Sequence, residues 1–205
     1  MAALLEACRR LAGRAPDLVA VDMPLALSPI VGRRVSDLAV SRAFGAAKAA
    51  THSPSALRPG PLADKLREDF AREGFALCTA SGARAPGLME VYPHAALLAL
   101  TGDKMRLTYK AGKTTIYWPG MALAVRRARV RDVWARIVAA LEREIGGVAE
   151  ALPAPGADVV GRPLKAYEDS LDAVVCAWVA IAALKGAVRA YGDHDSATWV
   201  PISVP

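Results

Sequence analysis

The sequence contains few cysteines and no apolar stretch long enough to cross a membrane. The three cysteines, Cys8, Cys78 and Cys176, are odd in number and far apart, so they form neither a zinc motif nor a disulfide framework. The longest apolar run, residues 173–184, is shorter than the roughly 20 residues that a transmembrane helix needs. The N-terminal residues lack the apolar stretch of a secretory signal. We therefore expect a cytoplasmic protein without a membrane contact.

The sequence also lacks the short motifs of several large enzyme classes. It contains no P-loop, no GxGxxG fingerprint, no nucleophile elbow and no internal repeat. It offers no Cys/His cluster for zinc either. The remaining candidates for chemistry are carboxylates and basic side chains.

The chain is of ordinary globular composition and mildly basic. Its 205 residues carry a formal charge of +6, with a sequence pI of about 9.5. This length predicts one domain over residues 1–205. The charge is compatible with a polyanionic partner, but many basic proteins of this composition bind no nucleic acid.

The stretch from Ala166 to Lys185 has the pattern of a buried helix with acidic residues near its start. After Asp172 it is apolar on nearly every side, as is typical of a buried helix. Asp169 and Asp172 are three residues apart, which places their Cβ atoms on one face, roughly 5–6 Å apart. Two carboxylates at the edge of a core favour a metal ion as a shared partner. Alternatively, these acids and Glu168 stabilise the helix dipole, which explains Asp172 less well.

Two predicted strands each carry an acidic residue near their C-terminal end. Residues 17–23 read DLVAVDM, which is apolar enough for a strand buried on both faces. Ligands bind at the C-terminal ends of strands in open α/β sheets, which favours a functional role for Asp22. Asp22 could equally bond the backbone of the following turn. In the second strand, GLMEVY, Glu90 could join the same site or pair with Arg34 or Arg42.

Basic residues form two groups along the chain. The first surrounds Asp37 in the stretch GRRVSDLAVSR, and the second precedes a helix predicted from Val130 to Ile145. Guanidinium groups bind phosphate in a bidentate manner, although a charged helix face is often simply solvated. Aromatic residues do not interleave with the second group, so a stacking platform for single strands is not indicated. The candidate phosphate-binding residues are Arg33, Arg34, Arg42, Arg126, Arg127 and Arg129.

Several stretches, in this order, resemble the DUF429 family of predicted RNase H-like nucleases. The matching stretches are VAVDMPL, RRVSDLAVSR, MEVYPHAAL, EDSLDAVVCAWVAIAALKG, YGDHD and the closing VPISVP. Each stretch alone is a weak signal, but their order and spacing are fairly specific. The resemblance covers nearly all of the chain from Leu18 onward.

The resemblance implies an RNase H-like α/β fold, with a mixed sheet flanked by helices. In that fold, carboxylates from the first strand, the fourth strand and the last helix hold divalent ions. Asp22 matches the fourth-strand position, and Asp169 and Asp172 match the last helix. These three residues are the implied metal ligands, for Mg²⁺ or Mn²⁺, and with Glu90 the implied catalytic residues. The implied reaction is hydrolysis of phosphodiester bonds in nucleic acid.

The start of the chain departs from the family pattern. Families of this kind open with three antiparallel strands, the first bearing an acid, whereas this chain begins with a helix predicted from Ala2. We therefore expect a single RNase H-like domain that lacks its first three strands. The strand at residues 17–23 would then have an unpaired apolar edge. We expect a homo-oligomer that covers this edge, and weak or absent cleavage by the chain alone.

Two other functions compete with a nuclease. The chain could be a non-catalytic RNase H-like module that binds nucleic acid or a protein partner through its basic face. It could also be an enzyme that uses the same acids on a small phosphorylated molecule. Binding to nucleic acid should weaken steeply with salt, which separates the first two functions from the third.

Overall fold

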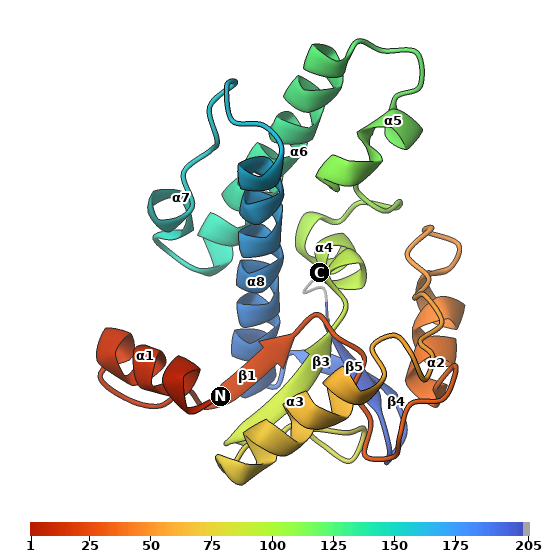
Figure 1. The fold of residues 1–205 in the computed structure, drawn as a ribbon, viewed down its shortest axis with the longest axis vertical. Helices are drawn as coiled ribbons and strands as arrows, with labels where there is room; N and C mark the ends of the chain where they lie inside the picture. Colours follow the sequence, from red (N-terminus) through yellow and green to blue (C-terminus); the bar gives the residue numbers. More distant parts are fainter. Residues whose placement is uncertain (203–205) are drawn as a thin grey trace.

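A computed structural model of the protein describes residues 1–202, which form a mixed β-sheet flanked by helices (Figure 1). The five-stranded sheet has the order β1-β3-β5-β4, and the short β2 also pairs with β3. All pairs are parallel except β4 with β5. In chain order the elements are α1 (Ala2–Ala12), β1 (Leu18–Val21), α2 (Val35–Phe44), α3 (Pro61–Arg72), β2 (Ala76–Leu77), β3 (Gly87–Val91), α4 (Pro93–Thr101), the 3₁₀ helix η1 (Ala111–Lys113), α5 (Thr114–Tyr117), α6 (Leu123–Glu144), α7 (Val148–Ala151), α8 (Arg162–Leu184), β4 (Val188–Gly192) and β5 (Ala197–Pro201).

The helix ends follow the start and stop signals of the sequence. α1 ends at Gly13, which adopts the left-handed conformation with φ 72°, as is common at helix C-termini. α3 and α4 begin at Pro61 and Pro93, where a missing N–H costs nothing because the first turn has no acceptor for it.

The sheet separates two hydrophobic cores. The larger core joins β3 and β5 to α4, α6 and α8, with Trp134 and Val175 among its buried residues. The smaller core joins α1 and α3 to the opposite face, with Leu5 and Phe70 at its centre. Because side chains alternate along a strand, Leu88 of β3 packs into the smaller core and its neighbour into the larger one.

β1 lies at the edge of the sheet. Within residues 1–202 it pairs only with β3, in parallel, with Val21 opposite Glu90. All four residues of β1 are half-buried, so the expectation of a strand fully buried on both faces was wrong. β1 is less buried than expected because it is an edge strand, with no paired strand on its outer side within residues 1–202.

Two predicted boundaries differ from the structure. The sequence of residues 186–195, which follows the buried helix, predicts a turn. In the structure these residues contain β4, which pairs with β5. The helix predicted from Val130 begins at Leu123, since its arginines are good helix formers. The sequence also predicts a final extended segment over residues 197–204, whose end lies beyond the described residues. None of the helices in the described part of the chain is long and apolar enough to cross a membrane.

Candidate active site

A cleft with a volume of about 390 Å³ opens at the C-terminal ends of β1 and β3. It is lined by Asp22 after β1, Tyr92 after β3 and Glu168 of α8. A smaller pocket of about 200 Å³ shares Asp22 and Tyr92 with the cleft and extends to Glu90 and Arg34. The sheet edge and α8 thus bring together acidic residues that are far apart in the sequence.

Three carboxylates of α8 form an acidic cluster, of which Glu168 lines the cleft. Glu168 and Asp172 lie one turn apart on the same face of α8 and are both buried, whereas Asp169 beside them is exposed. One oxygen of each carboxylate lies within 4.8 Å of the other two. Glu168 Oε2 also accepts a 2.6 Å hydrogen bond from the backbone N–H of Ala111 in η1. These three acids could hold a metal ion, since hard divalent cations prefer oxygen ligands.

Lysine and tyrosine side chains already neutralise or bond these acids. Lys110 Nζ donates to Asp172 Oδ2 at 2.5 Å and lies 3.5 Å from Glu168 Oε1. The buried hydroxyl of Tyr109 donates to Asp172 Oδ1 at 2.8 Å. Lys165 lies 3.3 Å from Glu168 Oε1 and also pairs with the third acid of α8. Burial raises the pKa of Asp172, and Lys110 and Tyr109 offset this only in part.

Asp22 is an exposed carboxylate whose pKa is nevertheless raised. Its side chain is exposed at the mouth of the cleft, yet protein atoms crowd around it and remove much of its hydration. This desolvation, together with the negative charge of Asp172, raises the pKa of Asp22 to about 6. Lys110 opposes the shift. Asp22 and Asp172 are therefore close enough to resist simultaneous ionisation, which a cation would relieve.

The lining of the cleft also includes basic side chains and a buried histidine. Arg106, Lys113 and His94 line it. The described residues provide no ion-pair partner for Arg106 or Lys113. Burial and the neighbouring cations lower the pKa of His94 to about 2, so its imidazole is neutral. We call Arg106, Lys113 and His94 the basic end of the cleft.

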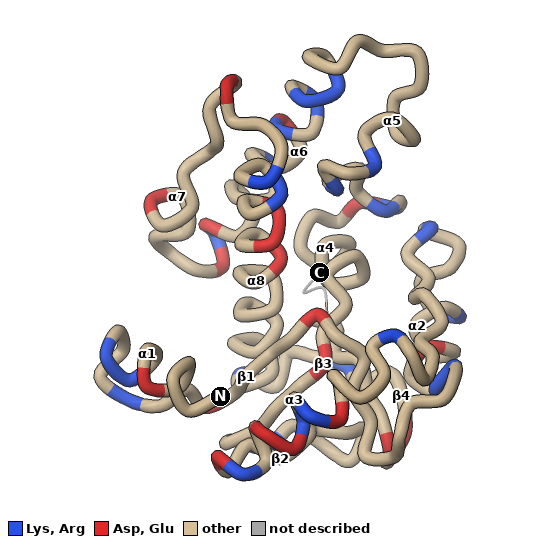
Figure 2. Tube along the Cα trace, in the orientation of Figure 1, with Lys and Arg blue, Asp and Glu red and all other residues tan. Residues whose placement is uncertain are grey.

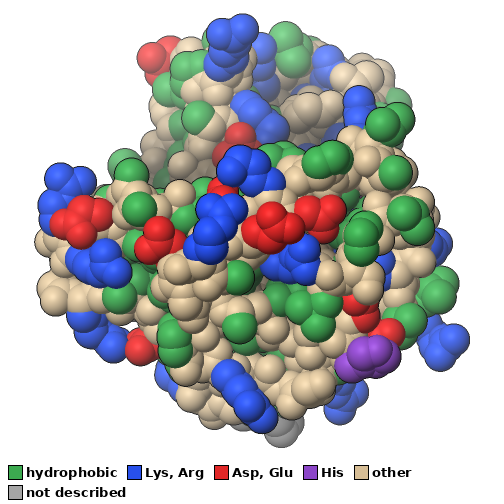
Figure 3. All heavy atoms as spheres, turned by 60° about the horizontal axis from the view of Figure 1, so that its bottom comes forward, with side chains coloured by type: hydrophobic (Ala, Val, Ile, Leu, Met, Phe, Trp, Pro, Cys, Tyr) green, Lys and Arg blue, Asp and Glu red, His purple; other side chains and the backbone are tan. Residues whose placement is uncertain are grey.

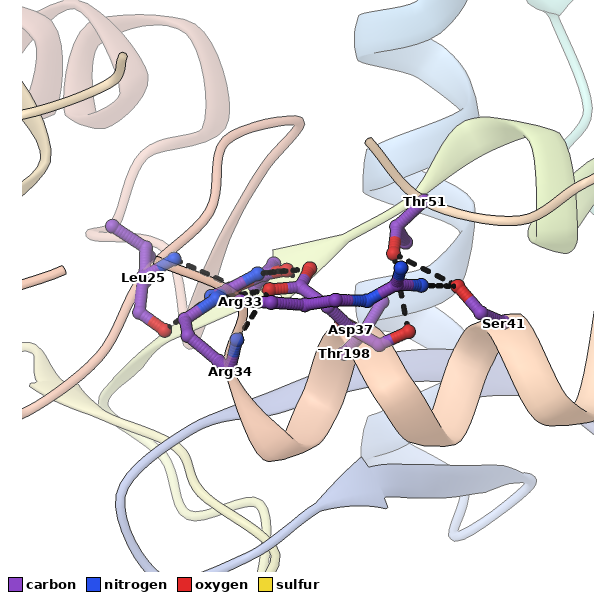
Figure 4. A network of polar contacts seen from close by, with 8 residues as sticks. Leu25, Arg33, Arg34, Asp37, Ser41, Thr51 and Thr198 are labelled. Atoms are coloured by element: carbon purple, nitrogen blue, oxygen red, sulfur yellow. Dashed lines mark hydrogen bonds and ion pairs between the residues drawn. The ribbon is translucent and has the colours of Figure 1, made fainter. Parts of the chain in front are cut away.

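Arg34 lies in a buried ion network at the base of the smaller pocket (Figure 4). Its guanidinium contacts both oxygens of Asp37, at 2.8 and 3.0 Å, and both oxygens of Glu90, at 2.5 and 2.9 Å. It also donates to the Leu25 carbonyl at 2.7 Å. All five N–H groups of Arg34 thus have acceptors inside the protein. Burial lowers its pKa, but the bonds to Glu90 and Asp37 outweigh burial and raise it overall.

Glu90 is part of this network and not of the α8 cluster. Beside Arg34, it accepts hydrogen bonds from the Leu25 N–H at 2.6 Å and the Thr198 hydroxyl at 2.9 Å. Its neighbours Met89 and Val91 pack into the core that contains α8. Because side chains alternate along β3, Glu90 points to the other face of the sheet. Of the two expectations for Glu90, the structure places it in the ion pair with Arg34.

The other predicted phosphate-binding arginines lie outside the cleft. Arg33 donates to Ser41 at 2.5 Å, and Arg42 on α2 is exposed. The remaining three, at the beginning of α6, lie near α5 (Figure 2). Arg126 donates to Thr115 of α5, and Arg129 lies 6.0 Å from the Trp118 ring; Arg127 follows Arg126 in the same turn of α6 and is half-buried. None of the five lines the cleft.

The face of the molecule that carries α3 is not a uniform basic patch. Figure 3 shows acidic and basic side chains side by side across the view turned towards the lower side of Figure 1. On α3, Lys65 and Arg72 each lie 2.9 Å from an oxygen of Asp69. Cations that are paired in this way are poorly suited to bind a polyanion.

Sequence reasoning missed four residues of the cleft. Glu168 was assigned to the helix dipole, although its spacing of four residues from Asp172 predicts a shared helix face. Lys110 and Arg106 belong to a basic stretch of the sequence, residues 104–113, that gives no sign of a site. His94 was not considered. No local pattern links the segment around residue 110 to α8, because the contact is between residues about 60 positions apart.

The chain was compared with protein families, curated proteins and solved structures. Residues 1–197 match the DUF429 family, described as proteins of unknown function. No curated protein and no solved structure matches the chain significantly. Because the family match spans nearly the whole sequence, the chain belongs to the DUF429 family.

Proposed function

We propose that the protein is a metal-dependent nuclease of RNase H-like type that hydrolyses phosphodiester bonds of nucleic acid. One observation carries this proposal: Asp22 of the sheet edge and Glu168 of α8 line one cleft together with Arg106 and Lys113. Carboxylates suit divalent ions, and cations suit the phosphate groups that such ions act on.

The acidic side chains of the site fit Mg²⁺ or Mn²⁺. Asp22, Glu168 and Asp172 offer only oxygen ligands, which these ions prefer. Burial raises the pKa values of Asp22 and Asp172, and a bound divalent ion would favour their ionised forms. Asp169, which is exposed and shares the same helix turn, could add a further oxygen. A divalent ion bound there would activate water and stabilise the negative charge that develops on the phosphate.

The basic residues of the cleft have two separate tasks in this proposal. Lys110 and Lys165 neutralise the α8 carboxylates while no metal ion is bound. Arg106 and Lys113 attract the anionic substrate to the cleft, because phosphodiester groups need cations nearby. Arg34, whose donors are all in use, supports the pocket wall.

The experiment is a cleavage assay with labelled single- and double-stranded DNA and RNA, in Mg²⁺, in Mn²⁺ and in EDTA. We expect weak cleavage with either metal, since the first-strand acid of the family pattern is missing, and a further loss of at least about 100-fold in the Asp22→Asn variant, since a ligand of the ion is removed. Asp64→Asn on α3 is the matched control and should cleave normally. Metal-independent cleavage, or equal activity of Asp22→Asn, would refute the proposal.

A non-catalytic module is the second candidate, and the ion pair between Lys110 and Asp172 favours it. An acid that is already neutralised by a lysine needs no metal. In that case the chain would bind nucleic acid in EDTA with a steep salt dependence, and Asp22→Asn would bind as well as the unaltered chain without any cleavage.

We also propose that the protein forms a homo-oligomer through β1. The strand is apolar, and in the described residues it pairs on one side only. An exposed strand edge of this kind promotes pairing with another strand, and a second copy supplies an identical one.

A further inference from the structure

The basic end of the cleft contains polar atoms that the protein itself does not satisfy. Nδ1 of His94 and Nε of Arg106 are both buried without a hydrogen-bond partner in residues 1–202. The His94 side chain is only 6% exposed. Buried polar groups in native proteins nearly always have partners, so two orphans at one site indicate a ligand.

We propose that Arg106, Lys113 and His94 form a subsite for a phosphate group of a nucleic-acid strand, separate from the metal-binding acids. The inference rests on the proposed function and assigns the cleft end at which the strand is held. It differs from the arginine groups on α2 and α6, none of which lines the cleft.

Charge and geometry make this end specific for an anion. Arg106 and Lys113 have no carboxylate partner in the described part of the chain, unlike Lys110 and Lys165, which are committed to the acids of α8. The guanidinium of Arg106 presents paired N–H donors that match two oxygens of one phosphate. Two cations without an ion pair in the described residues, one of them a bidentate donor, therefore line one cleft.

His94 adds a neutral donor that cannot repel the cations. Its ring is held edge-on between Tyr92 and Tyr109, with ring centroids 5.4 and 5.1 Å away. Tyr109 in turn bonds Asp172, so the phosphate subsite lies one aromatic ring away from the acids. His94 also lies in the first turn of α4, near the positive end of the helix dipole, which favours an anion.

The test measures phosphate binding without metal, so that it is independent of catalysis. Inorganic phosphate is titrated in EDTA against the full chain by calorimetry, and the ring ¹⁵N signals of His94 are followed by NMR. We expect saturable binding and a shift of the His94 signals. Arg106→Met should weaken binding about tenfold and Lys113→Met several-fold, since each loses a charge-assisted bond. Lys104→Met, an exposed lysine outside the cleft, is the matched control and should change nothing.

Two oligonucleotides identify the source of the phosphate. One carries a 5′-phosphate and the other does not. Preference for the phosphorylated strand that is lost in Arg106→Met assigns the subsite to a terminal phosphate. Equal binding of both strands, weakened to the same extent by Arg106→Met, assigns it to an internal phosphodiester. Arg106→Lys should retain part of the binding, provided that circular dichroism shows the variant to be folded. If the Arg106 variants do not fold, Lys113→Met tests the subsite in their place.

The inference is overturned if neither Arg106→Met nor Lys113→Met alters the binding of phosphate or of either oligonucleotide. It is also overturned if inorganic phosphate binds but neither strand does. These outcomes are separate from those of the cleavage assay: a chain that cuts normally with metal although Arg106→Met leaves binding unchanged keeps the proposed function and loses the subsite.

Discussion

Lys110 Nζ, which lines the cleft, lies 2.5 Å from Asp172 Oδ2, which belongs to the acidic cluster of α8 that could hold a metal ion. The ammonium group supplies the positive charge that the acids need in the absence of an ion. A metal must displace this charge or bind beside it, so Lys110 weakens metal affinity by competition.

The first prediction follows from this competition. Lys110→Met should bind Mn²⁺ about tenfold more tightly than the unaltered chain, equivalent to about 1.4 kcal/mol. The titration is run at pH 8, because removing Lys110 raises the pKa of Asp172 further. Lys104→Met should leave the affinity unchanged. Weaker binding by Lys110→Met would show that the lysine orients the ligands and does not compete.

The second prediction concerns pH and Asp22. Its folded-state pKa is raised to about 6 from the usual 3.8 of an aspartate, so the carboxyl contributes stability only while it is protonated. This contribution is lost as the pH rises through 6. Asp22→Asn should therefore be more stable than the unaltered chain above pH 6 and equal to it near pH 4.

The size of that effect is limited by solvent. Because Asp22 is exposed and partly screened, we expect about 1 kcal/mol at pH 8, or an increase in Tm of about 2–4 °C. Thermal unfolding at pH 4, 6 and 8 measures it. Asp169→Asn, an exposed acid, is the control with no stabilisation. A loss of stability in Asp22→Asn at pH 8 would contradict the desolvation of this group.

The third prediction concerns the ion network around Arg34. Arg34→Met leaves Asp37 and Glu90 buried without a cation, and should lower the free energy of unfolding by about 3–5 kcal/mol. Urea unfolding measures this loss. Arg42→Ala, on the exposed side of α2, should change stability by no more than about 0.5 kcal/mol. If Arg34→Met retains full stability, the guanidinium is free for a ligand after all.

The fourth prediction concerns the edge of the sheet. Analytical ultracentrifugation should show a dimer or a larger species that dissociates on dilution, because β1 has an apolar, unpaired side. Backbone amide exchange should be slower in β1 of the oligomer than in the monomer. A monomer at all concentrations would show that the edge is protected in another way.

The sequence predicted local elements better than the site they build. α1 and α3 follow from their periodic apolar residues and their end signals, which act over a few residues. β4 was missed because its five residues are only partly buried, and a half-exposed edge strand has weak patterning. Asp169 and Asp172 were proposed as a pair from their spacing, and Asp22 from its place at the end of a predicted strand; neither argument needs tertiary information.

Glu90 shows what spacing alone cannot supply. Its sequence context, an acid in an apolar strand, resembles that of Asp22. Only the register of β1 and β3 and the alternation of side chains decide that Glu90 faces Arg34 and not α8. Likewise, the role of Lys110 depends on a contact with Asp172 that no local pattern encodes.

The pairing of Val21 with Glu90 ties the cleft to the late stages of folding. Asp22, His94, Lys110 and Glu168 come from segments that are brought together by parallel strand pairing, which joins residues about 70 positions apart. Such long-range pairing forms slowly, since loop entropy is lost before contacts compensate. A partly folded chain would thus hold no complete set of ligands, and binding of a divalent ion would report that the whole sheet has reached its native register.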